Sequence, residues 1–391
     1  NFTADGGTIK LDGNYPVGTG NVALGDAAGA AITSGGRNTL IGGSAGDALT
    51  VGQRNVVIGT DALSADTQGS RSVAIGQAAL ANQNFTSATD NYNVAVGFQA
   101  GVNVTTGTTN TLIGGLAGDA ITTSSSNTAL GYESLTGLTT GNSNTAIGYR
   151  ALKTDTLGDR NVAVGNEALS TQNFTSSTDS YNVGVGYQAG KEVTTGTNNT
   201  LIGGLAGDAL TDGDNNVAVG TSALSAETRA DRNVAIGSSA LGAMNVGTDT
   251  DTYNVAVGCL AGANVTTGVQ NTIIGGLAGD ALTDADKNVA LGYAALTADT
   301  LGSRSVAIGR AVLNSQNFTS ATDTYNTAVG DNAGLSVTTG VRNTLIGGRA
   351  GDSMTTGSNN IGVGFDAIGS GTVTGNNNTA LGDGAGFSLT S

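Results

Sequence analysis

A five-residue motif recurs twenty-one times along the chain, and its fixed period constrains the fold more than any other feature of the sequence. The motif is Asn or Ser, then Val, Thr or Ile, then a small or aliphatic residue, then Leu, Ile or Val, then Gly; it begins first at Asn21 and last at Asn378. Motifs start 17 residues apart, except for a last step of 18 and four steps of 21, which end at Asn93, Asn182, Asn254 and Asn326. Because the motif returns in frame after each longer step, the extra residues are insertions in loops. The sequence therefore predicts a stack of twenty-one similar coils.

Each motif has the composition of a short strand that ends at a corner. Counting the Asn or Ser as position zero, position one is β-branched and position three is aliphatic in every coil, which favours extended backbone. Position four is Gly in every coil, as expected where the chain turns through a conformation that a side chain disfavours. Position seven is Ala in nineteen coils, and we expect a second short strand after the corner. Gly or Asp about three residues before the next motif indicates the turn that closes the coil.

These features predict an all-β fold, a parallel β-solenoid. A helix would need apolar residues every 3.6 positions and would be destabilised by the recurrent Gly. A 17-residue repeat is also too short for a hairpin plus a crossover helix, so each repeat is one coil bonded to its neighbours. With ~4.8 Å between coils, we expect an elongated rod on the order of 100 Å long. The solenoid domain spans residues 21–391, and residues 1–20 are expected to form a lead-in or cap segment.

The composition narrows the function classes. With 64 Gly, 4% aromatic residues and no Trp or His, the chain lacks the bulky side chains of an ordinary globular core, so small residues must do the packing. The net charge of −15 argues against nucleic-acid binding. No apolar run reaches the ~20 residues of a membrane helix, and no apolar leader opens the chain, so we expect no membrane insertion. The single cysteine, Cys259, cannot form an internal disulfide, and its Ala- and Gly-rich surroundings predict a buried, inert thiol.

The two faces of the motif strand differ in a way that predicts a partner chain. Positions one and three point to one side, and we expect position three, always aliphatic, to line the interior. Position two, on the other side, is Ala in thirteen coils and Leu in four, so this face is apolar as well. A narrow coil covers only one face, which predicts a homo-oligomer, a trimer, whose chains are packed or intertwined. The alternatives are that position two packs on a second internal layer, or that it is small and exposed.

The Asn at position zero is expected to form a ladder. Its side-chain amide would bond along the stack and satisfy backbone groups at the corner. This is an architectural role and not a catalytic one.

Several segments resemble known families. Asn233-Val-Ala-Ile-Gly-Ser-Ser-Ala-Leu and Ser72-Val-Ala-Ile-Gly-Gln-Ala-Ala-Leu resemble the head repeats of trimeric autotransporter adhesins, which fold as left-handed parallel β-rolls in threes but have shorter coils. The segments 141–152 and 18–29 are more similar to repeat regions of bacteriophage tail fibres and related virion proteins. The resemblance covers residues 21–391; the self-cleaving chaperone of many such fibres, and the stalk and anchor of the adhesins, have no counterpart in this sequence.

The four insertions concentrate the rare aromatic residues. The segments 84–92, 173–181, 245–253 and 317–325 are related to one another and lie four or five coils apart. Aromatic rings among Asp, Asn and Thr suit saccharide binding, which makes these inserts candidates for a receptor or glycan contact. The alternative is that the rings cover a local loop or clasp a neighbouring chain. The candidate residues are Phe85, Tyr92, Phe174, Tyr181, Tyr253, Phe318 and Tyr325.

The sequence predicts no catalytic, cofactor-binding or metal-binding residue, and therefore no enzyme. Without His there is no Ser-His-Asp or Cys-His arrangement, and no spacing pairs the four Glu residues. Asp119 and its equivalents in Gly-Gly-x-Ala-Gly-Asp segments faintly resemble calcium-binding repeats, but they recur too rarely for a cage of carboxylates. Asn84, Asn173 and Asn317 fit the glycosylation sequon, whose use is not expected in a viral or bacterial product.

Together these observations and the resemblance predict a structural fibre protein. We expect a tail fibre or other virion appendage, at the outer surface of the particle, that is a rigid spacer contributing to host-cell attachment. Its partners would be its own copies, other virion proteins, and a host glycan or receptor. The alternative is a bacterial surface adhesin of the trimeric autotransporter type, on the bacterial outer surface.

Overall fold

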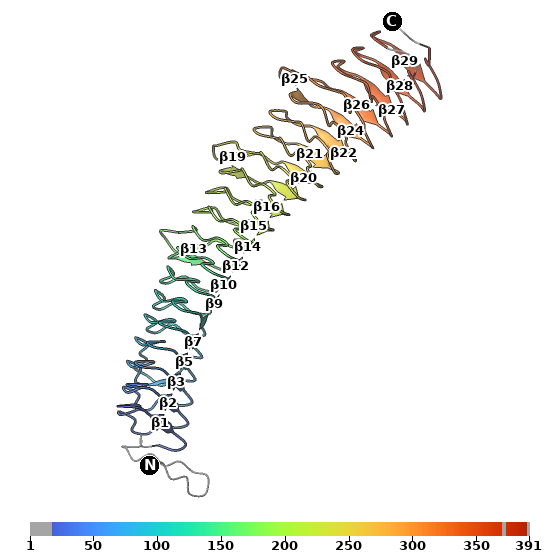
Figure 1. The fold of residues 1–391 in the computed structure, drawn as a ribbon. Helices are drawn as coiled ribbons and strands as arrows, with labels where there is room; N and C mark the ends of the chain where they lie inside the picture. The colour runs from blue at the N-terminus through green and yellow to red at the C-terminus, as the bar shows by residue number, and fades with distance from the viewer. Residues whose placement is uncertain (1–17, 370–372, 389–391) are drawn as a thin grey trace. The chain divides into compact units, whose positions relative to one another are not determined.

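A computed structural model describes residues 18–369 and 373–388 of the chain (Figure 1). The chain forms two compact units, residues 1–182 and 183–391. Most of the predicted lead-in, residues 1–17, lies outside the described residues. All regular elements in the described part are short strands. In the first unit they are β1 (Val22–Leu24), β2 (Thr39–Ile41), β3 (Val56–Ile58), β4 (Gly69–Ser70), β5 (Val73–Ile75), β6 (Thr89–Asp90), β7 (Val94–Val96), β8 (Thr111–Ile113), β9 (Thr128–Leu130), β10 (Thr145–Ile147), β11 (Gly158–Asp159), β12 (Val162–Val164) and β13 (Thr178–Asp179).

The second unit continues the same pattern. Its strands are β14 (Val183–Val185), β15 (Thr200–Ile202), β16 (Val217–Val219), β17 (Ala230–Asp231), β18 (Val234–Ile236), β19 (Thr250–Asp251), β20 (Val255–Val257), β21 (Thr272–Ile274), β22 (Val289–Leu291), β23 (Gly302–Ser303), β24 (Val306–Ile308), β25 (Thr322–Asp323), β26 (Thr327–Val329), β27 (Thr344–Ile346), β28 (Ile361–Val363) and β29 (Thr379–Leu381).

Within each unit the three-residue strands form one parallel sheet with matched register. Val73, Ala74 and Ile75 of β5 lie opposite Val94, Ala95 and Val96 of β7, although a lengthened coil separates these two strands. The same motif positions are paired in β1–β2, β8–β9 and β15–β16, so the insertions leave the register unchanged. The prediction of a parallel β-solenoid with about twenty-one coils is confirmed.

The Gly at position four is required by the approach of consecutive coils. Gly203 has a φ of +137°, and a Cβ placed on it would lie 2.5 Å from the carbonyl oxygen of Gly220 in the next coil. An ordinary van der Waals contact needs at least 3.4 Å, so a side chain would force the coils apart. The predicted corner is confirmed.

The second strand expected after the corner is absent, and this prediction is wrong. In the coil that starts at Asn55, the residues that follow Gly59 form turns, with Asp61 and Leu63 in the left-handed region at φ +57° and +50°. Alternate left-handed residues bend the backbone too sharply for a strand. The backbone nevertheless bonds along the stack, because the Leu63 N–H donates to the Ala79 carbonyl at 2.9 Å.

The inward and outward faces of the motif strand are the reverse of the prediction. Position two is buried throughout β2–β29, as at Ala74, whereas position three is half-buried or exposed, as at Leu130 with 45% exposure. The interior is narrow, so Ala fits at position two, and a larger residue there requires a smaller residue opposite it in the coil. Leu112 at position two shows this, because a Cβ added at Gly118, position eight of the same coil, would lie 2.8 Å from its Cδ2. The outward face is therefore the one made of β-branched and aliphatic residues.

The predicted asparagine ladder is confirmed. Asn55 donates its N–H to Oδ1 of Asn38 at 2.9 Å, and its Nδ2 donates to the Gly69 carbonyl at 3.0 Å. Equivalent bonds recur at Asn110 and Asn343. The ladder satisfies buried polar groups beside each strand, which stabilises the stack.

Candidate functional site

The four insertions add a second, smaller pairing to the stack. Each insertion ends in a two-residue strand, β6, β13, β19 or β25, that runs parallel to a two-residue strand of the preceding coil. Each of these strands ends in an aspartate, and a tyrosine follows two residues later, just before the next motif. The pairing fixes the position of both side chains relative to the coil below.

The phenylalanines of the insertions are buried. Phe85, Phe174 and Phe318 have only 7%, 5% and 7% exposure. The carbonyl of Phe85 also accepts a hydrogen bond from Oγ1 of Thr67 at 3.0 Å. These rings are therefore not accessible at the surface of the single chain.

A buried carboxylate holds each phenylalanine-containing insertion in place. At the first, Oδ1 of Asp66 accepts the N–H of Gly69 at 2.9 Å and that of Phe85 at 3.1 Å, and Oδ2 accepts Nε2 of Gln83 at 2.7 Å. Gln83 in turn accepts Nδ2 of Asn93 at 2.8 Å, which connects the insertion to the ladder.

The same arrangement recurs at the second and fourth insertions. Asp155 with Gln172, and Asp299 with Gln316, repeat the side-chain bond, and all four side chains have no exposure. Burial raises the pKa of the Asp66, Asp155 and Asp299 carboxyl groups above the ordinary value, because the loss of hydration outweighs the hydrogen bonds that favour the charged form.

The third insertion replaces this pair with another. Glu227 stands in place of the aspartate and Met244 in place of the glutamine. The longer Glu227 side chain reaches three backbone N–H groups through Oε1, including that of Ala230 at 2.9 Å, and its Oε2 accepts the N–H of Val246 at 3.3 Å. The extra methylene of Glu therefore removes the need for a glutamine donor.

At the surface, each tyrosine belongs to a cluster of three side chains. The arginine at the same position of the preceding coil lies over the ring and is ion-paired with the aspartate of the insertion. At the first insertion, Cζ of Arg71 is 5.3 Å from the Tyr92 ring centroid, and its Nε is 2.9 Å from Oδ1 of Asp90. We call this arrangement the Arg–Tyr–Asp cluster. The other three clusters are Arg160–Tyr181–Asp179, Arg232–Tyr253–Asp251 and Arg304–Tyr325–Asp323.

The clusters are open to solvent. Tyr92, Tyr181, Tyr253 and Tyr325 have 51%, 49%, 48% and 50% exposure. The Tyr253 hydroxyl accepts from Arg232 and donates to Asp251, each at 3.1 Å. The ring, the guanidinium and the carboxylate are thereby held in one orientation while half of the tyrosine surface stays accessible.

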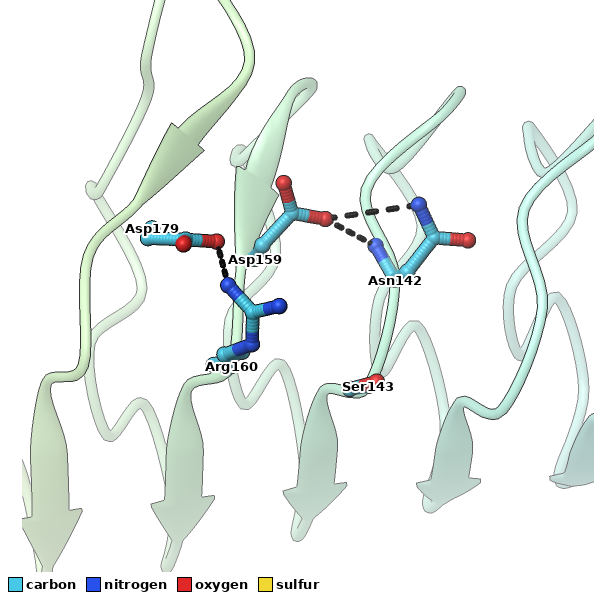
Figure 2. A pocket seen from close by; sticks show the side chains of 5 residues that line it. All are labelled: Asn142, Ser143, Asp159, Arg160 and Asp179. Carbon is cyan, nitrogen blue, oxygen red and sulfur yellow. Dashed lines mark hydrogen bonds and ion pairs between the residues drawn. The ribbon is translucent and has the colours of Figure 1, made fainter.

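A small polar cavity lies beside the second cluster. It has a volume of about 100 Å³ and is lined by Asn142, Ser143, Asp159, Arg160 and Asp179. Figure 2 shows these side chains on neighbouring coils, with Arg160 bonded to Asp179 and Asp159 bonded to Asn142. Asp159 also accepts from Ser177 at 3.0 Å. The cavity walls offer both donors and acceptors to a hydroxylated ligand.

Sequence reasoning identified the tyrosines and missed their partners. The four arginines carry a signal, because each stands directly before a motif, one coil ahead of an insertion tyrosine that also stands directly before a motif. The buried carboxylates also have a sequence signal, at position eleven of the coil. In the two coils at each insertion, position eleven is Asp and then Gln, or Glu and then Met. In the other coils where the structure describes position eleven, this residue is apolar.

Cys259 lies on the exposed face, so the prediction of a buried thiol is wrong. Asp119, considered above for calcium, accepts a hydrogen bond from Oγ1 of Thr136 at 2.7 Å. The described residues hold no group of three or more His, Cys, Asp or Glu side chains suited to a metal ion. No helix in residues 18–369 or 373–388 has the length and hydrophobicity to cross a membrane.

Comparison with known proteins gave no family assignment: no protein-family model matches the sequence, and no curated protein matches it.

Proposed function

We propose that this chain is a structural segment of a bacteriophage tail fibre or another virion appendage, where it is a rigid spacer that contributes to host-cell attachment. The observation that carries the proposal is the in-register stack within each unit, in which neighbouring coils bond to each other through the motif strand and the asparagine ladder. Such a stack resists bending because its bonds recur at each coil. The proposal assigns no catalytic role to any side chain.

The proposed assembly is a homotrimer formed through the outward sheet face. Positions one and three carry no charge in any coil, and position five adds exposed rings such as Tyr132 and Tyr149, which stack with centroids 6.0 Å apart. In the first unit, about nine coils at ~4.8 Å and a strip of five residues at ~3.3 Å each give roughly 700 Å² per chain. This is close to the ~800 Å² that each partner contributes to a standard stable interface. A second copy of the chain is the partner whose apolar rows have the same spacing.

The test of the assembly is the molar mass in solution. Leu130 is 45% exposed in the single chain, so Leu130→Lys should leave the coil folded and remove only association. Thr140→Lys, at an exposed turn residue away from the sheet, adds the same charge as a control. Light scattering should give three times the chain mass for the wild type and the control, and one chain mass for Leu130→Lys. A wild type with the mass of one chain at high micromolar concentration would refute the assembly.

The second candidate function is a bacterial surface adhesin of the trimeric autotransporter type. The motif Asn233-Val-Ala-Ile-Gly supports it, because it resembles the head repeats of those adhesins. Immunogold labelling separates the two. Labelled virions support the appendage, and labelled bacterial surfaces without virions support the adhesin.

A further inference from the structure

All four insertions share the Arg–Tyr–Asp cluster, an exposed arrangement that combines an aromatic ring with an ion pair. We propose that each cluster is a subsite for one neutral hexose ring of a cell-surface polysaccharide. The inference rests on the proposed attachment function and names its ligand class. The phenylalanines take no part, because they are buried.

The tyrosine ring supplies the apolar part of the subsite. The C–H face of a pyranose packs on an aromatic ring, and about half of each tyrosine is accessible. Arginine stacking, with Cζ 5.6 Å from the Tyr181 centroid and 5.7 Å from the Tyr325 centroid, fixes the ring in one orientation. A ring that is already ordered loses little conformational entropy on binding.

The ion pair supplies the polar part. A guanidinium has five N–H donors, and a carboxylate accepts about four hydrogen bonds, so the Arg160–Asp179 contact leaves capacity on both groups. Two neighbouring hydroxyl groups of a sugar can accept from the arginine and donate to the aspartate. The ~100 Å³ cavity beside this pair has about the volume of three waters, which such hydroxyl groups would displace.

The charge of the clusters favours a neutral sugar. The shared arginine and aspartate cancel, so the common part of the subsite has no net charge. The residue before the arginine is Ser70 and Ser303 in two clusters but Asp159 and Asp231 in the other two. A sialic acid or uronic acid would meet an additional carboxylate at half of the subsites, and a neutral ring is the ligand that all four clusters can accept.

The experiment uses the full chain and two matched variants. In the cluster variant, Tyr92, Tyr181, Tyr253 and Tyr325 are replaced by Ser. In the sheet variant, the equally exposed Tyr132, Tyr149, Tyr187 and Tyr293 are replaced by Ser instead. Each protein is measured on an array of neutral, sialylated and uronic-acid-bearing oligosaccharides, by titration with soluble neutral polysaccharide, and by light scattering for assembly.

We expect the wild type to bind neutral glucose-, galactose- or mannose-containing oligosaccharides. Because several subsites act together on one polymer, the cluster variant should lose at least tenfold in apparent affinity without a change of mass. A variant with Phe at the four cluster positions keeps the ring and should stay within about threefold of the wild type. The sheet variant should keep its intrinsic sugar binding even if its mass falls, so failure of the assembly and failure of the subsites give different results.

Three binding results would overturn the subsite assignment. They are no binding of any neutral oligosaccharide at millimolar concentration, a cluster variant that binds as the wild type does, and a preference for the acidic sugars. A cluster variant whose mass falls to that of one chain would also overturn it, since the tyrosines would then be contacts between chains.

Discussion

Replacement of Gly203 by alanine tests the stacking geometry at a single atom. The new Cβ would lie 2.5 Å from the Gly220 carbonyl oxygen, about 1 Å inside an ordinary contact, and the backbone φ of +137° disfavours any side chain. The conformation costs about 1–3 kcal/mol and the overlap a further 1–3 kcal/mol, so we expect a local loss of roughly 2–6 kcal/mol. Gly204→Ala is the control, because a Cβ there has no neighbour within 4 Å.

Hydrogen exchange measures this loss where it occurs, since a long repeat array need not unfold in one step. The amides of Gly220 and Ser222 donate to Ile202 at 2.7 Å and Gly204 at 3.0 Å across the same two coils. A loss of 2 kcal/mol or more makes their exchange at least about 30-fold faster in Gly203→Ala. Gly204→Ala should exchange within about threefold of the wild type. If both variants exchange at the wild-type rate, the coils are not in contact at position four and the reasoning fails.

Three further predictions concern the first insertion. Asp66→Glu and Gln83→Met should each destabilise the first insertion by about 1–3 kcal/mol. The double variant should recover at least half of the summed loss, because it recreates the Glu227–Met244 pair of the third insertion. The rate of proteolysis within residues 84–92 measures the stability of the insertion, and additive losses would contradict the prediction. Because the pKa of Asp66 is raised in the folded chain, the folded chain binds this proton more tightly than the unfolded chain does. The stability of the wild type relative to Asp66→Asn should therefore be greatest below the unfolded pKa of about 3.8 and should decrease as the pH rises through the folded pKa. A relative stability that increases with pH would contradict this prediction. Phe85→Ala should cost about 3 kcal/mol and speed exchange throughout the first insertion, while unchanged exchange there would show that the ring is not a core residue.

The period, the strand and the corner followed from the sequence because each depends on a residue type with one physical explanation. A Gly at position four of every coil signals a backbone contact, and Gly203 makes one. The sequence did not show which side of the motif strand faces the interior, because positions two and three are both apolar. The decisive signal was size compensation within a coil. Leu112 at position two occurs with Gly118 at position eight, and the two share the same interior space.

The candidate site was predicted only in part for a related reason. Tyr92 was found because aromatic residues are rare in this chain, whereas its partner Arg71 lies in a different coil, 21 residues earlier. Phe85 was placed with Tyr92 although one is buried and the other exposed. Composition cannot separate two aromatic residues of the same loop, because their burial depends on the path of the loop backbone, which bonds to Asp66 at Phe85.

An electron cryomicroscopy map of the assembled protein would show which face of the motif strand lies between chains. We predict three chains whose outward sheet faces meet, with Leu130 and Leu291 at the contact and the position-two residues such as Ala74 inside each coil. A map in which these leucines face solvent, or in which position two lies between chains, would contradict it.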